Sequence, residues 1–112
     1  MRRWSRLTAV DVLTDAGFET LEAGDAEEAL QLLEQHPEVD VLFTDVNMPG
    51  QIDGIALACR AHRARPQLAL VVTSGKQRIP DAELPDHGVF LPKPYGASEL
   101  VRVVTTQLYR RG

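Results

Sequence analysis

Three short apolar segments, separated by helix-like stretches, constrain this 112-residue chain more than any other feature. They cover residues 39–45, 68–72 and 89–91 and are rich in valine, leucine and phenylalanine. Nearly continuous apolar runs of this length are typical of parallel strands that are buried on both faces of a sheet. Strands that alternate with helices predict an α/β protein, in which right-handed crossovers place helices on both faces of a parallel sheet.

Several other segments have the periodicity of amphipathic helices. The clearest begins at Asp25, which has Glu28 at capping-box spacing, and ends at Pro37. Apolar residues recur within it at intervals of three and four, so one face can pack against the sheet. The other helices are predicted over residues 4–15, 53–63 and 97–110.

Two segments are less regular. Residues 18–23 alternate apolar and polar side chains, which predicts one more short strand. Residues 76–87 contain Pro80 and Pro85. Because proline removes a backbone donor and clashes with the preceding turn, any helix in that stretch is expected to be short or broken.

The composition restricts the classes of function. The chain has 12 basic and 16 acidic side chains, and its formal charge of −4 argues against a nucleic-acid-binding surface. No apolar run approaches the ~20 residues of a membrane span, and the one cysteine, Cys59, suits a reducing compartment. We therefore expect a single cytoplasmic domain over residues 1–112, with no nucleic-acid or membrane partner.

A polar residue stands at the end of each apolar strand. Asp45 closes the first strand, Thr73 follows the second, and Lys93 lies between two prolines after the third. The carboxyl ends of parallel strands meet at one edge of a sheet, where α/β proteins bind their ligands. A carboxylate, a hydroxyl and a cation at that edge can together receive a phosphoryl group. Taken singly, the aspartate is more typical of a turn, the threonine of a strand terminus and the lysine of a solvated loop.

The residues around these three positions form recognisable motifs. They are Phe-Thr-Asp-Val-Asn-Met-Pro-Gly at 43–50, Asp-Gly at 53–54, Val-Val-Thr-Ser-Gly at 71–75 and Phe-Leu-Pro-Lys-Pro-Tyr at 90–95. With this spacing the chain resembles the receiver domain of two-component response regulators, from its first residue to about residue 109.

The resemblance implies a flavodoxin-like fold and a role for each motif. Asp45 would accept a phosphoryl group from a histidine kinase or a histidine phosphotransfer protein. Thr73 would be the switch hydroxyl, Lys93 the cation that pairs with the phosphate, and Phe90 the aromatic side chain that repacks with the switch. Asp45 and the backbone carbonyl of Asn47 would help to hold Mg²⁺. The peptide bond after Lys93 is expected to be cis.

One departure from the family pattern affects both the fold and the metal. Receiver domains begin with a central strand that ends in an acidic pair, and this pair holds the Mg²⁺. Here a helix is predicted close to Met1, so that strand is missing between residues 18–23 and 39–45. We expect roughly four strands and four to five helices. The true start of the protein can lie upstream, or a rearrangement or a partner's strand can close the gap, or the chain is unstable.

Three functions stay open at this stage. The first is a stand-alone receiver that is phosphorylated on Asp45, signals through protein contacts and is not an enzyme beyond its own phosphorylation and dephosphorylation. The second is a pseudo-receiver that recognises partners without phosphorylation, which the missing acidic pair favours. The third, a flavin carrier or small flavodoxin-like enzyme, lacks the Gly-rich phosphate loop that it needs. Homodimer formation, the cognate kinase and the downstream partner are left open.

Overall fold

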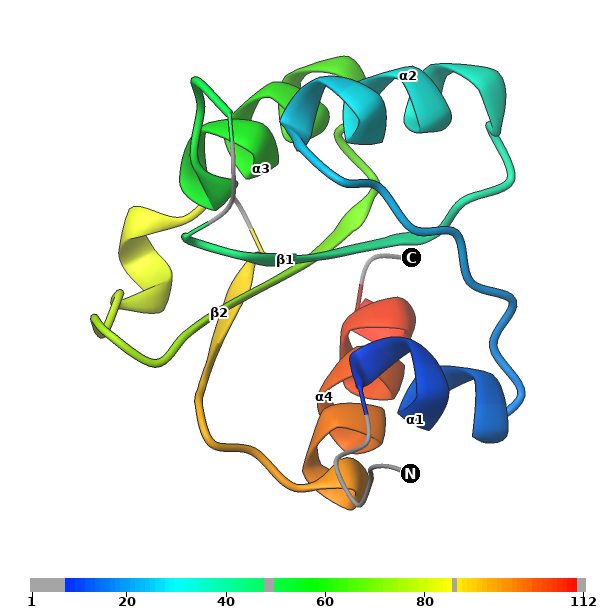
Figure 1. Cartoon of the computed structure of the whole chain (residues 1–112), viewed down its shortest axis with the longest axis vertical. Coiled ribbons are helices and arrows are strands. Elements are labelled where there is room, and N and C mark those ends of the chain that lie inside the picture. Colours follow the sequence, from blue (N-terminus) through cyan, green and yellow to red (C-terminus); the bar gives the residue numbers. More distant parts are fainter. Residues whose placement is uncertain (1–7, 48–49, 86, 111–112) are drawn as a thin grey trace, which may run out of the picture.

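The computed structural model describes residues 8–47, 50–85 and 87–110 of the chain. They form helices above and below a small sheet (Figure 1). In chain order the elements are α1 (Ala9–Asp15), α2 (Ala26–Gln35), β1 (Val41–Asp45), α3 (Gly54–Ala64), β2 (Ala69–Ser74), the 3-10 turn η1 (Asp81–Glu83), β3 (Val89–Pro92) and α4 (Ala97–Arg110).

The sheet is parallel, with the strand order β1-β2-β3. Its central strand, β2, is buried at every position, as its continuous apolar sequence predicts. In Figure 1, α2 and α3 lie on one side of the sheet, and α1 and α4 lie together on the other. The predicted α/β architecture, a parallel sheet with helices on both faces, is therefore confirmed.

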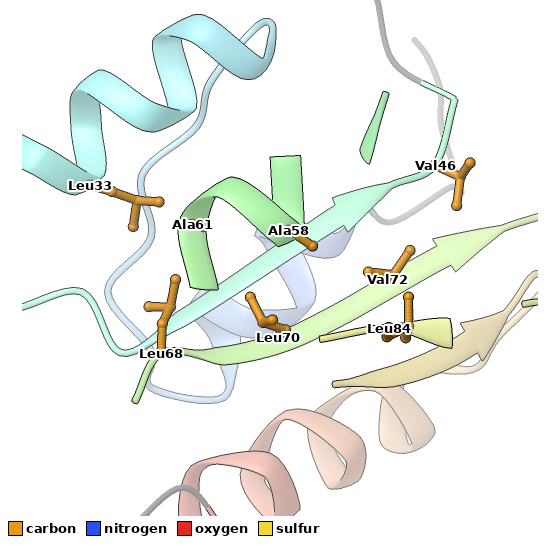
Figure 2. Close-up of a cluster of buried hydrophobic side chains, with 8 residues drawn as sticks. All are labelled: Leu33, Val46, Ala58, Ala61, Leu68, Leu70, Val72 and Leu84. Carbon is orange, nitrogen blue, oxygen red and sulfur yellow. The ribbon is translucent and has the colours of Figure 1, made fainter. Parts of the chain in front are cut away.

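Apolar side chains from alternating positions of β2 pack into a separate core on each face. Leu70 and Val72 point toward α3, in the cluster drawn in Figure 2. Val71, on the opposite face, packs with Leu100 and Val104 of α4. The buried members of the first cluster are Leu33, Val46, Ala58, Ala61, Leu68, Leu70, Val72 and Leu84. These two cores hold the carboxyl ends of the strands in a fixed relation, which matters for the site.

Residues 18–23, which the alternating pattern predicts as a strand, form no strand in the structure. Leu21, in the middle of this stretch, is 51% exposed. A strand is stabilised by hydrogen bonds to a neighbour, and the central strand that would pair with this segment is not among the described residues. The prediction was wrong because local alternation cannot replace that missing neighbour.

The first helix also differs from the prediction over residues 4–15. It begins at Ala9, since Thr8 is extended and caps the helix: its hydroxyl accepts from the Asp11 N–H at 3.2 Å. The Asp11 carboxylate accepts in return from the Thr8 N–H at 3.4 Å. Residues 4–7, like Met48 and Pro49 of the predicted turn, lie outside the described residues.

The remaining predicted elements are confirmed to within two residues at each end. The stretch with two prolines holds only η1, as expected. No helix in the described part of the chain is long and apolar enough to cross a membrane.

Candidate functional site

The three strand ends meet at one edge of the sheet, as the sequence predicts. Asp45 at the end of β1 is in register with Thr73 of β2, and Thr73 is in register with Leu91 of β3. Lys93 follows β3 directly, and its N–H donates to the Ser74 carbonyl at 3.1 Å, which continues the sheet by one residue. Parallel pairing therefore brings together side chains that are 48 positions apart in the sequence.

Lys93 and Asp45 form an ion pair, in which the Lys93 ammonium donates to Oδ2 of the carboxylate. The backbone N–H of Asn47 donates to the other carboxylate oxygen, Oδ1, at 3.0 Å. The Asp45 side chain is 31% exposed, so an incoming group can reach it. A pair that is solvated to this extent stabilises the fold by only about 0.2–1 kcal/mol, so its position matters more for chemistry than for folding. The Lys93-Pro94 peptide bond is cis, as expected.

Gly54 lies against the backbone of Asp45. A Cβ built on Gly54 would be only 2.0 Å from the Asp45 carbonyl oxygen, closer than any real contact. The Gly54 N–H also donates to the Val46 carbonyl at 2.9 Å, and Asp53 caps α3 by accepting from the Ala56 N–H at 2.9 Å. The Asp-Gly pair thus ends the turn after Asp45 and lets α3 approach the strand. The sequence contains this pair but does not reveal the close approach.

Thr73 lies beside Asp45 in the sheet, but its hydroxyl is turned toward β3. This side chain is almost completely buried, and its Oγ1 donates to the Leu91 carbonyl at 2.5 Å. The hydroxyl would have to exchange that hydrogen bond for one to a ligand at Asp45. The structure therefore confirms the position of Thr73 at the strand ends, and its role as a switch stays a prediction.

Ser74, which the sequence analysis did not single out, joins two loops of the site. Its buried hydroxyl accepts from the Lys76 N–H at 3.1 Å and from the Gln77 N–H at 3.3 Å. The Asn47 side-chain amide reaches the same oxygen at 3.3 Å. Both the backbone N–H and the side-chain amide of Asn47 therefore form hydrogen bonds within the site. A serine that follows a strand-end threonine is a weak signal, because such residues are common at any strand terminus.

Phe90 and Tyr95 are the first and last residues of the motif at positions 90–95. Phe90 is partly buried against the core cluster of Figure 2, and its N–H donates to Asp81 of η1 at 2.9 Å. Tyr95 packs edge-on against Phe43, with ring centroids 6.0 Å apart. Burial raises the pKa of the Tyr95 hydroxyl above 10.0; the Lys93 ammonium opposes this shift and the Asp45 carboxylate adds to it. The pKa of the Tyr95 hydroxyl is therefore set mainly by burial and only secondarily by the two charges of the ion pair.

The described residues do not by themselves fit a magnesium ion. Within residues 8–47, 50–85 and 87–110, no three histidine, cysteine, aspartate or glutamate side chains cluster as metal ligands do. Mg²⁺ is held by oxygen ligands, and here the Lys93 ammonium already binds one oxygen of the Asp45 carboxylate. The site expected from Asp45 and the Asn47 carbonyl is thus incomplete in this part of the chain.

Comparison with known proteins places this geometry in a family. The chain matches the family model of the response regulator receiver domain over residues 4–105. The chain belongs to the response regulator receiver domain family. The expected flavodoxin-like receiver fold is confirmed by solved receiver structures. Members of this family are in general signalling modules that bind Mg²⁺ for phosphorylation and interact with histidine kinases or phosphotransfer proteins.

Three relatives illustrate how much of each receiver the chain covers. It is 32% identical over 108 residues to the transcriptional regulatory protein PdtaR of Mycobacterium tuberculosis, a match covering 94% of this chain and 52% of PdtaR. It is 30% identical over 102 residues to the response regulator receiver protein CpdR of Brucella abortus, covering 88% of this chain and 83% of CpdR. The crystal structure of the NtrX receiver domain from Brucella abortus superimposes with a TM-score of 0.81 at 28% identity, covering 90% of this chain and 87% of that one. This receiver thus spans about half the length of PdtaR and most of the other two.

Proposed function

We propose that this receiver accepts a phosphoryl group on Asp45 from a histidine kinase or a histidine phosphotransfer protein. An Asp45 carboxylate oxygen would form a bond to phosphorus while the bond from phosphorus to the donor nitrogen breaks. The donor imidazole leaves with that electron pair. The observation that carries the proposal is the ion pair between Asp45 and Lys93 at the strand ends. Lys93 supplies a cation beside the carboxylate, and that cation can remain to pair with the phosphoryl oxygens.

The downstream effect would pass through protein contacts made by the surface of the receiver domain. Thr73 and Phe90 would transmit the change: the Thr73 hydroxyl would leave Leu91 for the phosphoryl group, and Phe90 would repack behind it. We also infer a single domain, no enzymatic activity beyond the domain's own phosphorylation chemistry, and a cytoplasmic location, which the single cysteine suits.

Intact-mass measurement after incubation with acetyl phosphate tests the proposal directly. The wild type should gain the mass of one phosphoryl group, and Asp45→Asn should gain none, because an amide is not a nucleophile toward phosphorus. Asp15→Asn, at the far end of α1, is the matched control and should label like the wild type. Labelling of Asp45→Asn to the wild-type extent would show that another group accepts the phosphate.

A second candidate function is a pseudo-receiver that binds its partner without phosphorylation. The observation that favours it is that no three metal-ligating side chains cluster among the described residues, because an anionic donor that approaches Asp45 is repelled unless enough positive charge is present. The same mass measurement, run with Mg²⁺ and with a chelator, separates the two candidates. The pseudo-receiver predicts no adduct in either condition with acetyl phosphate or with a phosphorylated phosphotransfer protein.

A further inference from the structure

Ser74 lies at the end of the central strand, between the two charged residues of the site. Asp45 ends the strand on one side of it, and Lys93 follows the strand on the other. Only 2% of Ser74 is exposed, and three N–H groups converge on its hydroxyl oxygen. The side chain cannot rotate without breaking all three hydrogen bonds, so its orientation is fixed.

Toward β1, the Ser74 hydroxyl holds Asn47. The Asn47 side-chain amide donates to this hydroxyl at 3.3 Å, and the Asn47 N–H donates to Oδ1 of Asp45 at 3.0 Å. Asn47 is exposed, so packing alone does not restrain its side chain. The hydrogen bond to Ser74 therefore restrains the residue that contacts the carboxylate.

Toward β3, Ser74 shapes the turn that supports Lys93. Its hydroxyl accepts from the Lys76 N–H at 3.1 Å and from the Gln77 N–H at 3.3 Å, which closes a turn at Gly75. A Cβ built on Gly75 would lie 3.5 Å from Cβ of Lys93 and 3.7 Å from its Cδ, so the aliphatic chain of Lys93 passes next to this turn. The Ser74 carbonyl also accepts from the Lys93 N–H at 3.1 Å. Residues 74–75 thus contact both the backbone and the side chain of Lys93.

We propose that Ser74 is a positioning residue for the phosphorylation of Asp45, acting through Asn47 on one side and through the turn beside Lys93 on the other. The inference rests on the proposed function and adds a residue that sets its rate. The Asn47 N–H and the Lys93 ammonium each bind one oxygen of the carboxylate, so a shift of either one turns the nucleophile. Group transfer depends steeply on such placement, since a displacement of about 1 Å can cost about 10²-fold in rate.

A purely structural role for Ser74 gives a different expectation. Lys76 and Gln77 are exposed, so water can take over their N–H groups when the hydroxyl is removed. A structural role would lower the unfolding midpoint slightly and leave the labelling rate of the folded chain unchanged. A positioning role lowers the labelling rate of a chain that is still folded.

The initial rate of labelling by acetyl phosphate, with Mg²⁺ present, tests the proposal on the full chain by intact mass. All variants are compared at a temperature at which circular dichroism shows them folded. Ser74→Ala should label about fivefold more slowly, the factor expected for one lost hydrogen bond. Ser74→Thr keeps a hydroxyl on the same carbon and should label within about twofold of the wild type. Ser98→Ala removes an exposed hydroxyl on α4 and, as the matched control, should label at the wild-type rate.

A double-mutant cycle shows whether Ser74 acts through Asn47. Asn47→Ala removes the side-chain amide, keeps the backbone N–H that binds Asp45, and should slow labelling about threefold. Because the two side chains share one hydrogen bond, the double variant should be slowed by clearly less than the product of the two single factors. Single factors that multiply would show that the two residues act independently and would overturn the proposal.

The same measurements separate this inference from the proposed function. A wild type that takes no label would refute the proposed function, and the inference with it. A wild type that is labelled on Asp45, with Ser74→Ala labelled equally fast, would refute the positioning role alone and leave the proposed function standing.

Discussion

Gly54→Ala should destabilise the domain, although alanine normally favours a helix. In a helix interior the change from glycine to alanine stabilises by at most about 1 kcal/mol. At Gly54 the new Cβ would lie 2.0 Å from the Asp45 carbonyl oxygen and 2.7 Å from its carbonyl carbon. These are backbone atoms of a packed strand end, so α3 and β1 would have to separate by about 1 Å. Overpacking of this kind costs about 1–3 kcal/mol, and here the upper part of that range should apply.

Thermal unfolding followed by circular dichroism measures the effect. A net loss of about 2 kcal/mol should lower the midpoint by at least about 8 °C in a domain of this size. Gly24→Ala is the matched control, because its Cβ would meet only the end of the Glu28 side chain, at 3.4 Å. Its midpoint should stay within about 4 °C of the wild type. If Gly54→Ala unfolds at the wild-type temperature, the close approach of α3 to Asp45 is not a feature of the folded protein.

Three further predictions concern the site and its support. Lys93→Gln should slow labelling by acetyl phosphate about tenfold, because the cation beside Asp45 is lost. The free energy of unfolding should change by less than about 1 kcal/mol, since the ion pair with Asp45 is partly solvated. A large stability loss with unchanged labelling would contradict this. Gln107→Leu should cost about 1–3 kcal/mol in urea unfolding, because the buried Gln107 amide donates hydrogen bonds to the Leu70 and His87 carbonyls that leucine cannot make. An unchanged midpoint would contradict this. The Tyr95 hydroxyl should titrate above pH 10.0 by ultraviolet difference against Tyr95→Phe. Because its folded pKa is raised, it stabilises the fold below pH 10.0, and that contribution is lost as pH rises through the folded pKa; a midpoint at or below 10.0 would contradict it.

The sequence predicted what depends on backbone topology. Continuous apolar runs located β1, β2 and β3, and the rule that parallel strands end at one edge brought Asp45 and Lys93 together before any coordinates. The prediction of a strand over residues 18–23 was wrong for the opposite reason. Alternation is a local property of the sequence, whereas a strand forms only when a neighbouring strand pairs with it. The alternating pattern does not show whether such a neighbour is present.

The sequence could not predict how side chains are oriented within the site. The direction of the Thr73 hydroxyl, toward Leu91 rather than Asp45, is a choice among rotamers that packing decides. The link between Asn47 and Ser74 joins two loops that are far apart in the sequence. Thr8 and Asp11 have the spacing of a capping box, but the predicted helix over residues 4–15 placed both inside the helix.

The residue that carries the phosphoryl group tests the central claim most directly. After labelling with acetyl phosphate, reduction with borohydride converts an aspartyl phosphate into homoserine, which tandem mass spectrometry can locate. We predict homoserine at position 45 and at no other aspartate of the chain. A modified residue elsewhere, or an adduct that borohydride leaves unchanged because a histidine carries it, would contradict the assignment of Asp45.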